Sequence, residues 1–194
     1  MQTAFIGMGA NLASKAGPPE VTLAAAAERL ESLGQVVCRS SLYSTEPVGY
    51  AEQPRFVNAV VAMETDLEPR ALLEGLLGIE QEFGRDRSAG IQNGPRTLDL
   101  DILLFGDRVI SEPGLEIPHP RIRERKFVLI PLREIASNVL KVCHGTTVTQ
   151  LLNEALTLPH GDSNDAVLPI QSHVWRAGVC RDAADAAGDE RAID

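Results

Sequence analysis

The segment Gly94–Phe105, with the sequence GPRTLDLDILLF, constrains the fold of this chain more than any other part. From Leu98 onward it alternates apolar and acidic residues and then becomes wholly apolar, which is typical of a β-strand that follows a Gly-Pro turn. Side chains on a strand alternate between the two faces of the sheet, so Asp99 and Asp101 share one face. Two carboxylates this close repel each other unless open water or a cation lies beside them.

The apolar residues around the two aspartates favour a cation over open water. Mg²⁺ is usually held by one or two carboxylates together with substrate phosphates, so it fits this pattern. The alternative is an exposed edge strand with solvated acids, which is the commoner meaning of a bare Asp-x-Asp. Three arginines close by in the sequence, Arg85, Arg87 and Arg96, favour the first interpretation because they suit shared anionic ligands, phosphates above all.

The distribution of charge supports an anion site. The chain has 194 residues, enough for one well-packed domain, and a formal net charge of -9, which argues against a nucleic-acid-binding protein. Residues 85–126 hold eight Lys and Arg against seven Asp and Glu, a net of +1, so the rest of the chain carries -10. The basic side chains are therefore concentrated around the aspartate pair.

Cysteine usage and hydropathy indicate the compartment. Cys38, Cys143 and Cys180 lack the spacing of a metal site and predict reduced thiols. The N-terminus has no signal-peptide pattern, and no apolar run approaches the length of a membrane span. We expect a cytoplasmic monomer without membrane or nucleic-acid partners.

Hydrophobic periodicity predicts strands over residues 2–8, 36–43, 56–65 and 98–105, and helices over residues 20–33, 69–83, 126–135 and 148–156. The first six elements follow the order strand, helix, strand, strand, helix, strand. This order predicts an α+β fold, the ferredoxin-like βαββαβ sandwich, with an antiparallel sheet and helices on one face.

The last part of the chain, residues 159–194, is polar and has no clear periodicity. We interpret it as a disordered extension of a domain formed by residues 1–158, so that deletion after Leu158 should leave activity intact. The alternative is that Trp175 packs this segment against the domain as an extra element.

Residues 94–102 resemble the signature of the 6-hydroxymethyl-7,8-dihydropterin pyrophosphokinase family. Residues 6–12, 43–49, 53–59 and 117–120 are similar to further motifs of that family at the right spacing, and the resemblance extends over residues 2–157. It implies the same ferredoxin-like fold. It also implies Mg²⁺-dependent transfer of pyrophosphate from ATP to 6-hydroxymethyl-7,8-dihydropterin, which gives AMP and the pterin diphosphate in folate biosynthesis.

The resemblance assigns roles to individual residues. It implies that Asp99 and Asp101 hold two Mg²⁺ ions that bridge the ATP phosphates, and that Arg85 and Arg96 are catalytic. The implied nucleotide-binding residues are Glu80, Arg87, Ile102, His119, Arg121 and Arg125. The implied pterin-binding residues are Thr45, Val48, Phe56, Asn58 and Phe127. A pterin is a flat ring system with a donor-acceptor edge, which suits aromatic faces and an amide partner.

Each of these residues alone has an ordinary structural explanation. Phe56 and Phe127 would be core residues, Asn58 a solvated strand residue and His119 a loop histidine. Only their joint spacing favours the functional interpretation.

Two positions depart from the family pattern. Asn93 stands where the family often has a Trp, and Pro120 stands where an aromatic residue often follows the histidine. The loop over residues 85–93, which we expect to act as a lid over the phosphates, is one residue longer than usual.

Two other functions remain open at this point. The first is a palm-type phosphotransferase, which would need a nucleic-acid groove and is disfavoured by the net acidity. The second is a non-catalytic binding module, which would be expected to have lost an aspartate or an arginine of the set.

Overall fold

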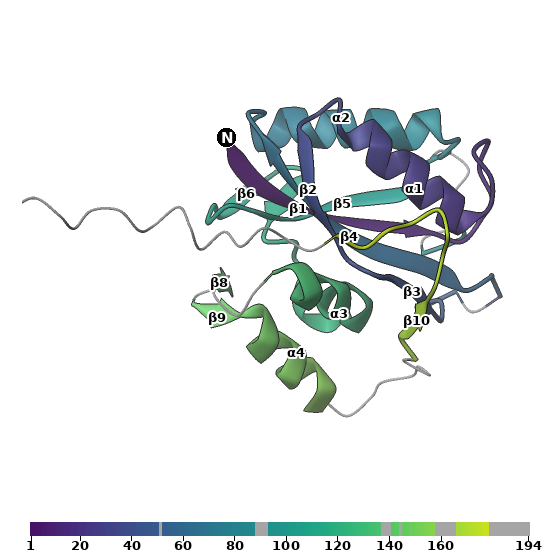
Figure 1. Ribbon diagram of the computed structural model, residues 1–194. Helices are drawn as coiled ribbons and strands as arrows, with labels where there is room; N and C mark the ends of the chain where they lie inside the picture. The colour runs from purple at the N-terminus through teal and green to yellow at the C-terminus, as the bar shows by residue number, and fades with distance from the viewer. Residues whose placement is uncertain (51, 88–92, 137–140, 144, 158–165, 179–194) are drawn as a thin grey trace, which may run out of the picture.

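The computed structural model describes residues 1–50, 52–87, 93–136, 141–143, 145–157 and 166–178 (Figure 1). The main sheet contains β1 (Gln2–Ala10), β2 (Gln35–Arg39), β3 (Leu42–Thr45), β4 (Phe56–Thr65), β5 (Asp99–Phe105) and β10 (Leu168–Ile170). The helices are α1 (Pro19–Leu30), α2 (Pro69–Glu82), α3 (Lys126–Ile135), α4 (Val148–Thr157) and a short 3-10 helix, η1 (Ile122–Glu124). Two small hairpins are formed by β6 (Ile110–Glu112) with β7 (Leu115–Ile117), and by β8 (Lys141–Cys143) with β9 (Thr146–Thr147).

The main sheet has the strand order β10-β3-β4-β1-β5, and β2 also pairs with β4. Every pair in it is antiparallel. The order confirms the ferredoxin-like βαββαβ prediction, because β1 lies in the middle between the third and fourth strands of that unit.

Helices cover both faces of the sheet (Figure 1). On one face α1 and α2 bury a core with one side of β1, β4 and β5, in which Ile6, Met63 and Leu100 are prominent. On the other face α3 and α4 pack against Phe5, Val60 and neighbouring apolar residues. The prediction of helices on one face therefore describes α1 and α2, and the later helices add a third layer.

The strand predicted over residues 36–43 is two strands, because the ladder to β4 is broken at Ser40. There the backbone N–H of Ser40 donates to the Val60 carbonyl at 2.9 Å, while the Ser40 hydroxyl oxygen accepts the Val60 N–H at 2.9 Å. A side chain thus replaces one backbone partner, and the strand bends between β2 and β3. At the other end of the sheet, β1 continues to Ala10 instead of ending at Met8.

The C-terminal segment departs most from expectation. In residues 166–178, β10 pairs with β3 and Trp175 is only 5% exposed, which is the alternative of an extra element packed against the domain. For this segment the interpretation as a disordered extension is wrong. Residues 159–165 and 179–194 lie outside the described residues, and the boundary at residue 158 stays a prediction.

The prediction of reduced thiols is wrong for Cys38, which is disulfide-bonded. Cys180 lies outside the described residues. Where helices are described, none combines the length and the apolar character that a membrane span requires. The cytoplasmic location and the monomeric state stay predictions.

Candidate active site

A cavity of about 370 Å³ lies on the α3 face of the sheet, between the ends of β1, β4 and β5 and the start of α3. It is lined by most of the predicted site residues: Thr45, Val48, Phe56, Asn58, Arg85, Arg87, Arg96, Asp99, Asp101, His119, Arg121, Arg125 and Phe127. Residues outside the predicted site set also line it, among them Gly7, Gly9, Glu46, Asn93 and Glu124. The structure thus brings together side chains from widely separated parts of the chain.

The register of β1 explains why this face of the sheet is open. Gly7 pairs with Asp101, and Gly9 pairs with Asp99 on one side and Asn58 on the other. A Cβ at Gly9 would lie 2.9 Å from Asn58 Oδ1, and one at Gly7 would lie 3.2 Å from Leu103 Cδ2. Because side chains alternate along β1, both glycines lie on the face that carries the two aspartates, and they leave room beside both carboxylates. The sequence alone could not select these glycines, because their pairing with the aspartates depends on the register of the sheet.

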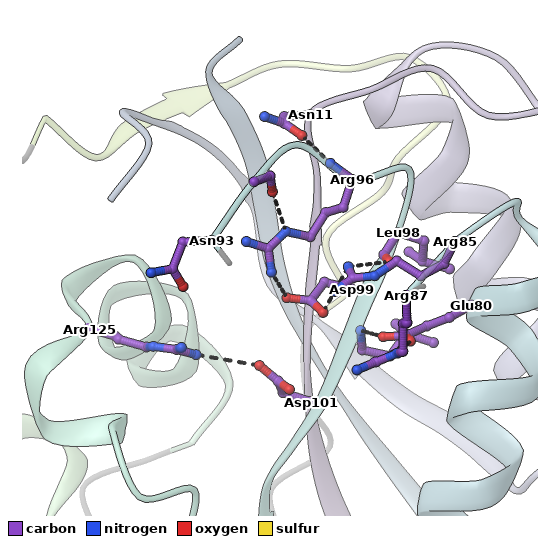
Figure 2. Close-up of polar contacts among 12 residues, drawn as sticks. Asn11, Glu80, Arg85, Arg87, Asn93, Arg96, Leu98, Asp99, Asp101 and Arg125 are labelled. Atoms are coloured by element: carbon purple, nitrogen blue, oxygen red, sulfur yellow. Dashed lines mark hydrogen bonds and ion pairs between the residues drawn. The ribbon is translucent and has the colours of Figure 1, made fainter. Parts of the chain in front are cut away.

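Asp99 is held by two arginines (Figure 2). Arg85 Nη1 lies 3.0 Å from its Oδ1, and Arg96 Nη1 lies 2.7 Å from its Oδ2. Arg85 Nη1 also donates to the Leu98 carbonyl at 2.9 Å, which fixes the guanidinium against the start of β5. Both arginines are mostly buried, so the pair of charges attracts strongly and each arginine is directed toward the space beside the carboxylate.

Asp101 has weaker partners than Asp99. Arg125 Nη1 lies 3.4 Å from its Oδ2 and His119 Nε2 lies 3.8 Å from the same atom. Its side chain is 39% exposed, against 23% for Asp99. Burial lowers the pKa of His119, Arg125 and Arg121 lower it further, and Asp101 opposes them, so the imidazole is neutral at physiological pH.

Asn11 links the turn before β5 to the loop before β4, although it is not among the predicted site residues. Its Oδ1 accepts the Arg96 backbone N–H at 2.7 Å, and its Nδ2 donates to Gln53 Oε1 at 2.9 Å and to the Pro54 carbonyl at 3.0 Å. The contact with Arg96 is visible in Figure 2. An Asn directly after a strand that ends in Gly-Ala was the available signal, since such residues satisfy backbone groups at turns.

Two predicted nucleotide residues, Glu80 and Ile102, lie outside the lining of the cavity. The Ile102 side chain belongs to the core between the sheet and α1 and α2. Glu80 is 1% exposed. Its Oε1 accepts the Leu100 N–H at 2.8 Å, and Arg87 donates to its Oε2, with Nε at 3.1 Å (Figure 2).

The position of Glu80 makes it a support for β5. It accepts the backbone N–H of Leu100, which lies between the two aspartates, and it also holds the Arg87 guanidinium. Burial raises the pKa of Glu80, the bonds from Arg87 and the Leu100 N–H lower it, and the nearby Asp99 raises it. Burial lowers the pKa of Arg87, but its hydrogen bond and ion pair with Glu80 and the charges of Asp99 and Asp101 together raise that pKa above its ordinary value, so Arg87 stays charged.

The five predicted pterin residues also line the cavity, and they come from β3, β4, the loop between these strands and α3. Asn58 Nδ2 donates to Thr45 Oγ1 at 2.7 Å, and both side chains are buried. The rings of Phe56 and Phe127 each carry an arginine, with Arg96 Cζ 5.1 Å and Arg125 Cζ 5.6 Å from the respective ring centroids. These contacts place the aromatic residues next to the cationic groups, at distances at which cation–π attraction operates.

Two of the elements that carry these residues, β3 and α3, are joined by hydrogen bonds. The Tyr43 hydroxyl on β3 donates to Glu134 on α3, and the Ser41 N–H donates to Glu134 Oε2 at 2.6 Å. Burial raises the pKa of Tyr43 to about 12, with the bond to Glu134 as a second cause, so the hydroxyl keeps its proton at physiological pH. The strand that carries Thr45 is thereby fixed to the helix that carries Phe127.

Asn93 occupies the edge of the cavity in a left-handed backbone conformation, with φ of 58°. Asn tolerates this conformation better than most residues, whereas a Trp would be strained. Its carbonyl accepts from Gln53 Nε2 at 2.9 Å, so it leans on the loop before β4. The rest of the predicted lid, residues 88–92, lies outside the described residues.

Arginines gathered around paired carboxylates, on one side of a pocket with aromatic and amide groups, define an enzyme that transfers a phosphate-containing group to a small molecule. Comparison with known proteins makes this class specific. The family model described as 7,8-dihydro-6-hydroxymethylpterin-pyrophosphokinase matches residues 5–137. The chain belongs to this family of pyrophosphokinases.

Relatives agree with this assignment. The 2-amino-4-hydroxy-6-hydroxymethyldihydropteridine pyrophosphokinase of Pseudomonas aeruginosa is 42% identical over 154 residues, which are 78% of this chain and 91% of the relative. The enzyme of the same name from Bacillus subtilis is 44% identical over 140 residues, 71% of this chain and 80% of its own length. A folate synthesis bifunctional protein of Arabidopsis thaliana is 50% identical over 100 residues, 52% of this chain and 20% of its own. The chain is therefore a pyrophosphokinase of folate biosynthesis that acts on small molecules.

A solved structure agrees in fold. The wild-type HPPK-DHPS of Plasmodium falciparum superposes with a TM-score of 0.59 at 16% identity, over 79% of this chain and 44% of that one. The match spans less than half of that longer chain, and at this identity it shows the fold alone.

Proposed function

We propose that this protein transfers pyrophosphate from ATP to 6-hydroxymethyl-7,8-dihydropterin in a Mg²⁺-dependent reaction, and that AMP and the pterin diphosphate are its products. The observation that carries the proposal is that one cavity brings together two sets of side chains. Asp99, Asp101 and the arginines form one set, which we call the phosphate end, and Phe56, Asn58 and Phe127 belong to the other set, which we call the pterin end. A phosphate chain and a flat polar ring would therefore meet inside a single space.

The phosphate end suits a polyphosphate. Arg85 and Arg96 are already paired with Asp99, and Arg121 and Arg125 also line the cavity. Their guanidinium groups can exchange a carboxylate partner for phosphate oxygens, which they bind with two parallel hydrogen bonds. Charge that accumulates on the transferred group would be neutralised without rearrangement of the sheet.

Asp99 and Asp101 would hold the divalent cation. Among the described residues no cluster of three or more His, Cys, Asp or Glu side chains exists, so a site built wholly from protein ligands does not fit. A carboxylate pair completed by phosphate oxygens and water does fit Mg²⁺. When bound, the ion would supply charge neutralisation at the phosphates. The number of ions, two by family resemblance, stays a prediction.

The pterin end would orient the acceptor. Phe56 on β4 and Phe127 on α3 would stack on the ring, while Asn58 presents an amide to its donor-acceptor edge. Thr45 holds the Asn58 amide in one orientation, and this limits the rotation of the ring that it binds. The hydroxymethyl oxygen would then face the arginines and attack the β-phosphorus in line, as the bond to the α-phosphate oxygen breaks and AMP leaves with the hydroxyl proton released.

Product analysis tests this proposal. The protein would be mixed with ATP, Mg²⁺ and 6-hydroxymethyl-7,8-dihydropterin, and nucleotides and pterins would be followed by chromatography. We expect AMP and the pterin diphosphate in equal amounts. ADP with a pterin monophosphate would overturn the transfer chemistry, and binding of both ligands without turnover would favour the non-catalytic alternative.

A further inference from the structure

Residues 166–178, which we call the C-terminal strap, lie beyond the segment that the family model matches, residues 5–137. In Figure 1 the strap is the yellow chain that runs along β3 at one edge of the sheet and then turns toward α1. It contacts the domain at three places, and the first two involve β3 or the loop next to the pterin end of the cavity.

The first contact is with β3 itself. Leu168 pairs with Ser44, Pro169 with Tyr43, and Ile170 with Leu42 in an antiparallel ladder. Thr45, the next residue of β3, lines the cavity and accepts the hydrogen bond from Asn58. Without β10, β3 would be an edge strand with one row of unpaired backbone groups, and such strands are less firmly held.

The second contact runs through Arg55, which connects the strap to the end of β3. Its Nε donates to Ser44 Oγ at 2.8 Å, and its Nη2 donates to the carbonyls of Ser44 and Ala166, each at 3.2 Å. The same guanidinium forms an ion pair with Glu46, which lines the cavity. One planar group therefore fixes Ser44 and Glu46, the residues on either side of Thr45, together with the first residue of the strap.

The third contact anchors the far end of the strap. The buried Trp175 ring belongs to the core on the α1 face, and its Nε1 donates to the Ser40 carbonyl at 2.8 Å. Arg39 Cζ lies 5.6 Å from the ring centroid, and the Gly178 N–H donates to the Arg39 carbonyl at 3.0 Å. The strap is thus fastened on both sides of the break between β2 and β3.

We propose that the C-terminal strap positions the pterin end of the active site by holding β3, with Arg55 as the positioning residue that transmits its hold to Ser44 and Glu46. The inference rests on the proposed function, because it names the pterin end as the part that depends on the strap. The phosphate end is built from β5, the residues before it and the residues around η1, and the strap pairs with none of these in the ladder described. Loss of the strap should therefore weaken binding of the pterin and leave binding of the nucleotide unchanged.

The test compares the full chain with a chain that ends at residue 165. For each, the Kd of Mg²⁺ with a non-hydrolysable ATP analogue is measured, and then the Kd of the dihydropterin at saturating analogue. Because misplacement of a binding group by a fraction of an ångström costs about tenfold, we expect the pterin Kd to rise about tenfold and the analogue Kd to stay within about twofold. Equal losses for both ligands, or no loss, would overturn the proposal.

Arg55→Met in the full chain gives a second, independent measurement, which decides the matter if the shortened chain fails to fold. It should weaken pterin binding selectively, and Arg55→Lys should not restore it because an ammonium group lacks the fork that reaches Ser44 and Ala166 together. Arg70→Met is the matched control, since Arg70 also joins a carboxylate, Glu112, and a carbonyl, that of Pro113, on a remote surface. Equal effects of the Arg55 and Arg70 substitutions would contradict a positioning role.

The same samples separate this inference from the proposed function. If the full chain releases no AMP from ATP and the pterin, the proposed function fails. If it does so and the chain ending at residue 165 binds the pterin equally well, the strap alone is wrong. A double-variant comparison adds a further check: Arg55→Met should have less than about half its effect in the shortened chain, because residues that act as a unit are not additive.

Discussion

The two ends of the cavity are held in place by different kinds of contact. At the phosphate end, long charged side chains pair across elements, as Arg85 and Arg96 do with Asp99. At the pterin end, the Asn58 amide bonds to the Thr45 hydroxyl and β3 pairs with its two neighbours, and the Arg55–Glu46 ion pair supports this neutral framework. Charge pairs can be exchanged for ligand charges, whereas a neutral pocket works only when its shape is fixed. The phosphate end therefore depends mainly on which charged residues are present, whereas the pterin end depends on the contacts that hold its strands in position.

The largest effect should follow from a change at the phosphate end. Asp99→Ala removes the proposed metal ligand and the shared partner of two arginines, so we expect AMP production to fall about 10³-fold or more, as for the loss of a central electrostatic group. The chain should remain folded, since Asp99 lies at the cavity wall and not in the core. Initial rates and thermal unfolding measure the two outcomes.

Asp107→Ala is the control for this variant, because Asp107 is an exposed acid in the turn after β5. Activity in the Asp99 variant close to that of the control would show that the carboxylate holds no catalytic ion.

A smaller effect, at the opposite end, should follow from Asn58→Leu. The substitution keeps the size of the side chain but leaves the polar edge of the ring and the Thr45 hydroxyl without a partner. Because an unpaired polar group costs about 1–3 kcal/mol, the pterin Kd should rise about 10- to 100-fold while the nucleotide Kd is unchanged. Isothermal titration with each ligand would check this, and a matched loss of nucleotide affinity would break the division between the two ends.

Gly9→Ala probes the point where the two ends meet. A Cβ there would lie 2.9 Å from Asn58 Oδ1, whose amide is tied to Thr45 and cannot move freely. We expect pterin affinity to fall about three- to tenfold, less than for Asn58→Leu, since the amide is displaced and not removed. Gly78→Ala is the control, because nothing lies within 4 Å of a Cβ at this helical glycine. It should raise the melting temperature and leave binding unchanged.

The smallest effect concerns the support behind β5. Burial holds the pKa of Glu80 above its ordinary value of 4.5, so the folded chain binds this proton more tightly than the unfolded chain. The stabilising contribution of the group is therefore complete below that ordinary value and is lost as pH rises through the folded pKa.

Glu80→Gln keeps an acceptor for the Leu100 N–H but no longer titrates. The free energy of unfolding of the variant, relative to the natural chain, should therefore improve as pH is raised from about 5 to about 8. Urea unfolding at several pH values measures this difference, and a constant difference across the range would contradict the raised pKa.

Much of the fold could be predicted because its patterns are strong. The alternating and apolar run of β4 and the amphipathic pattern of α3 match the predicted bounds, residues 56–65 and 126–135. The errors have local causes. Gly9 and Ala10 resemble the end of a strand because they carry little side chain, yet the neighbouring strands hold them in the ladder. Ser40 breaks a strand by taking a backbone partner with its hydroxyl, which no periodicity reveals.

The site divides in the same way. The side-chain type of an aspartate or arginine already indicates its chemistry, so the lining of the phosphate end could be predicted from the sequence. The family resemblance assigns Glu80 to the nucleotide, and its position at the edge of the apolar stripe of α2 cannot show that it accepts the Leu100 N–H. Packing of the strap through Trp175 is only the second interpretation from the sequence, because β10 is three residues long and contains Pro169, which is compatible only with an edge strand. Its position depends on partners far away in the sequence.

The glycines of β1 have a consequence for how the sheet assembles. Ile6 and Met8 point into the α1 face, and Gly7 and Gly9 leave the opposite face open. A slip of β1 by one residue would exchange these faces, so it would fill the catalytic space with side chains and empty the core of two large ones. Burial of each such side chain is worth about 1.5–3 kcal/mol, so the misaligned sheet is strongly disfavoured. The alternation of small and large residues that leaves the cavity open therefore also selects the correct register of the central strand.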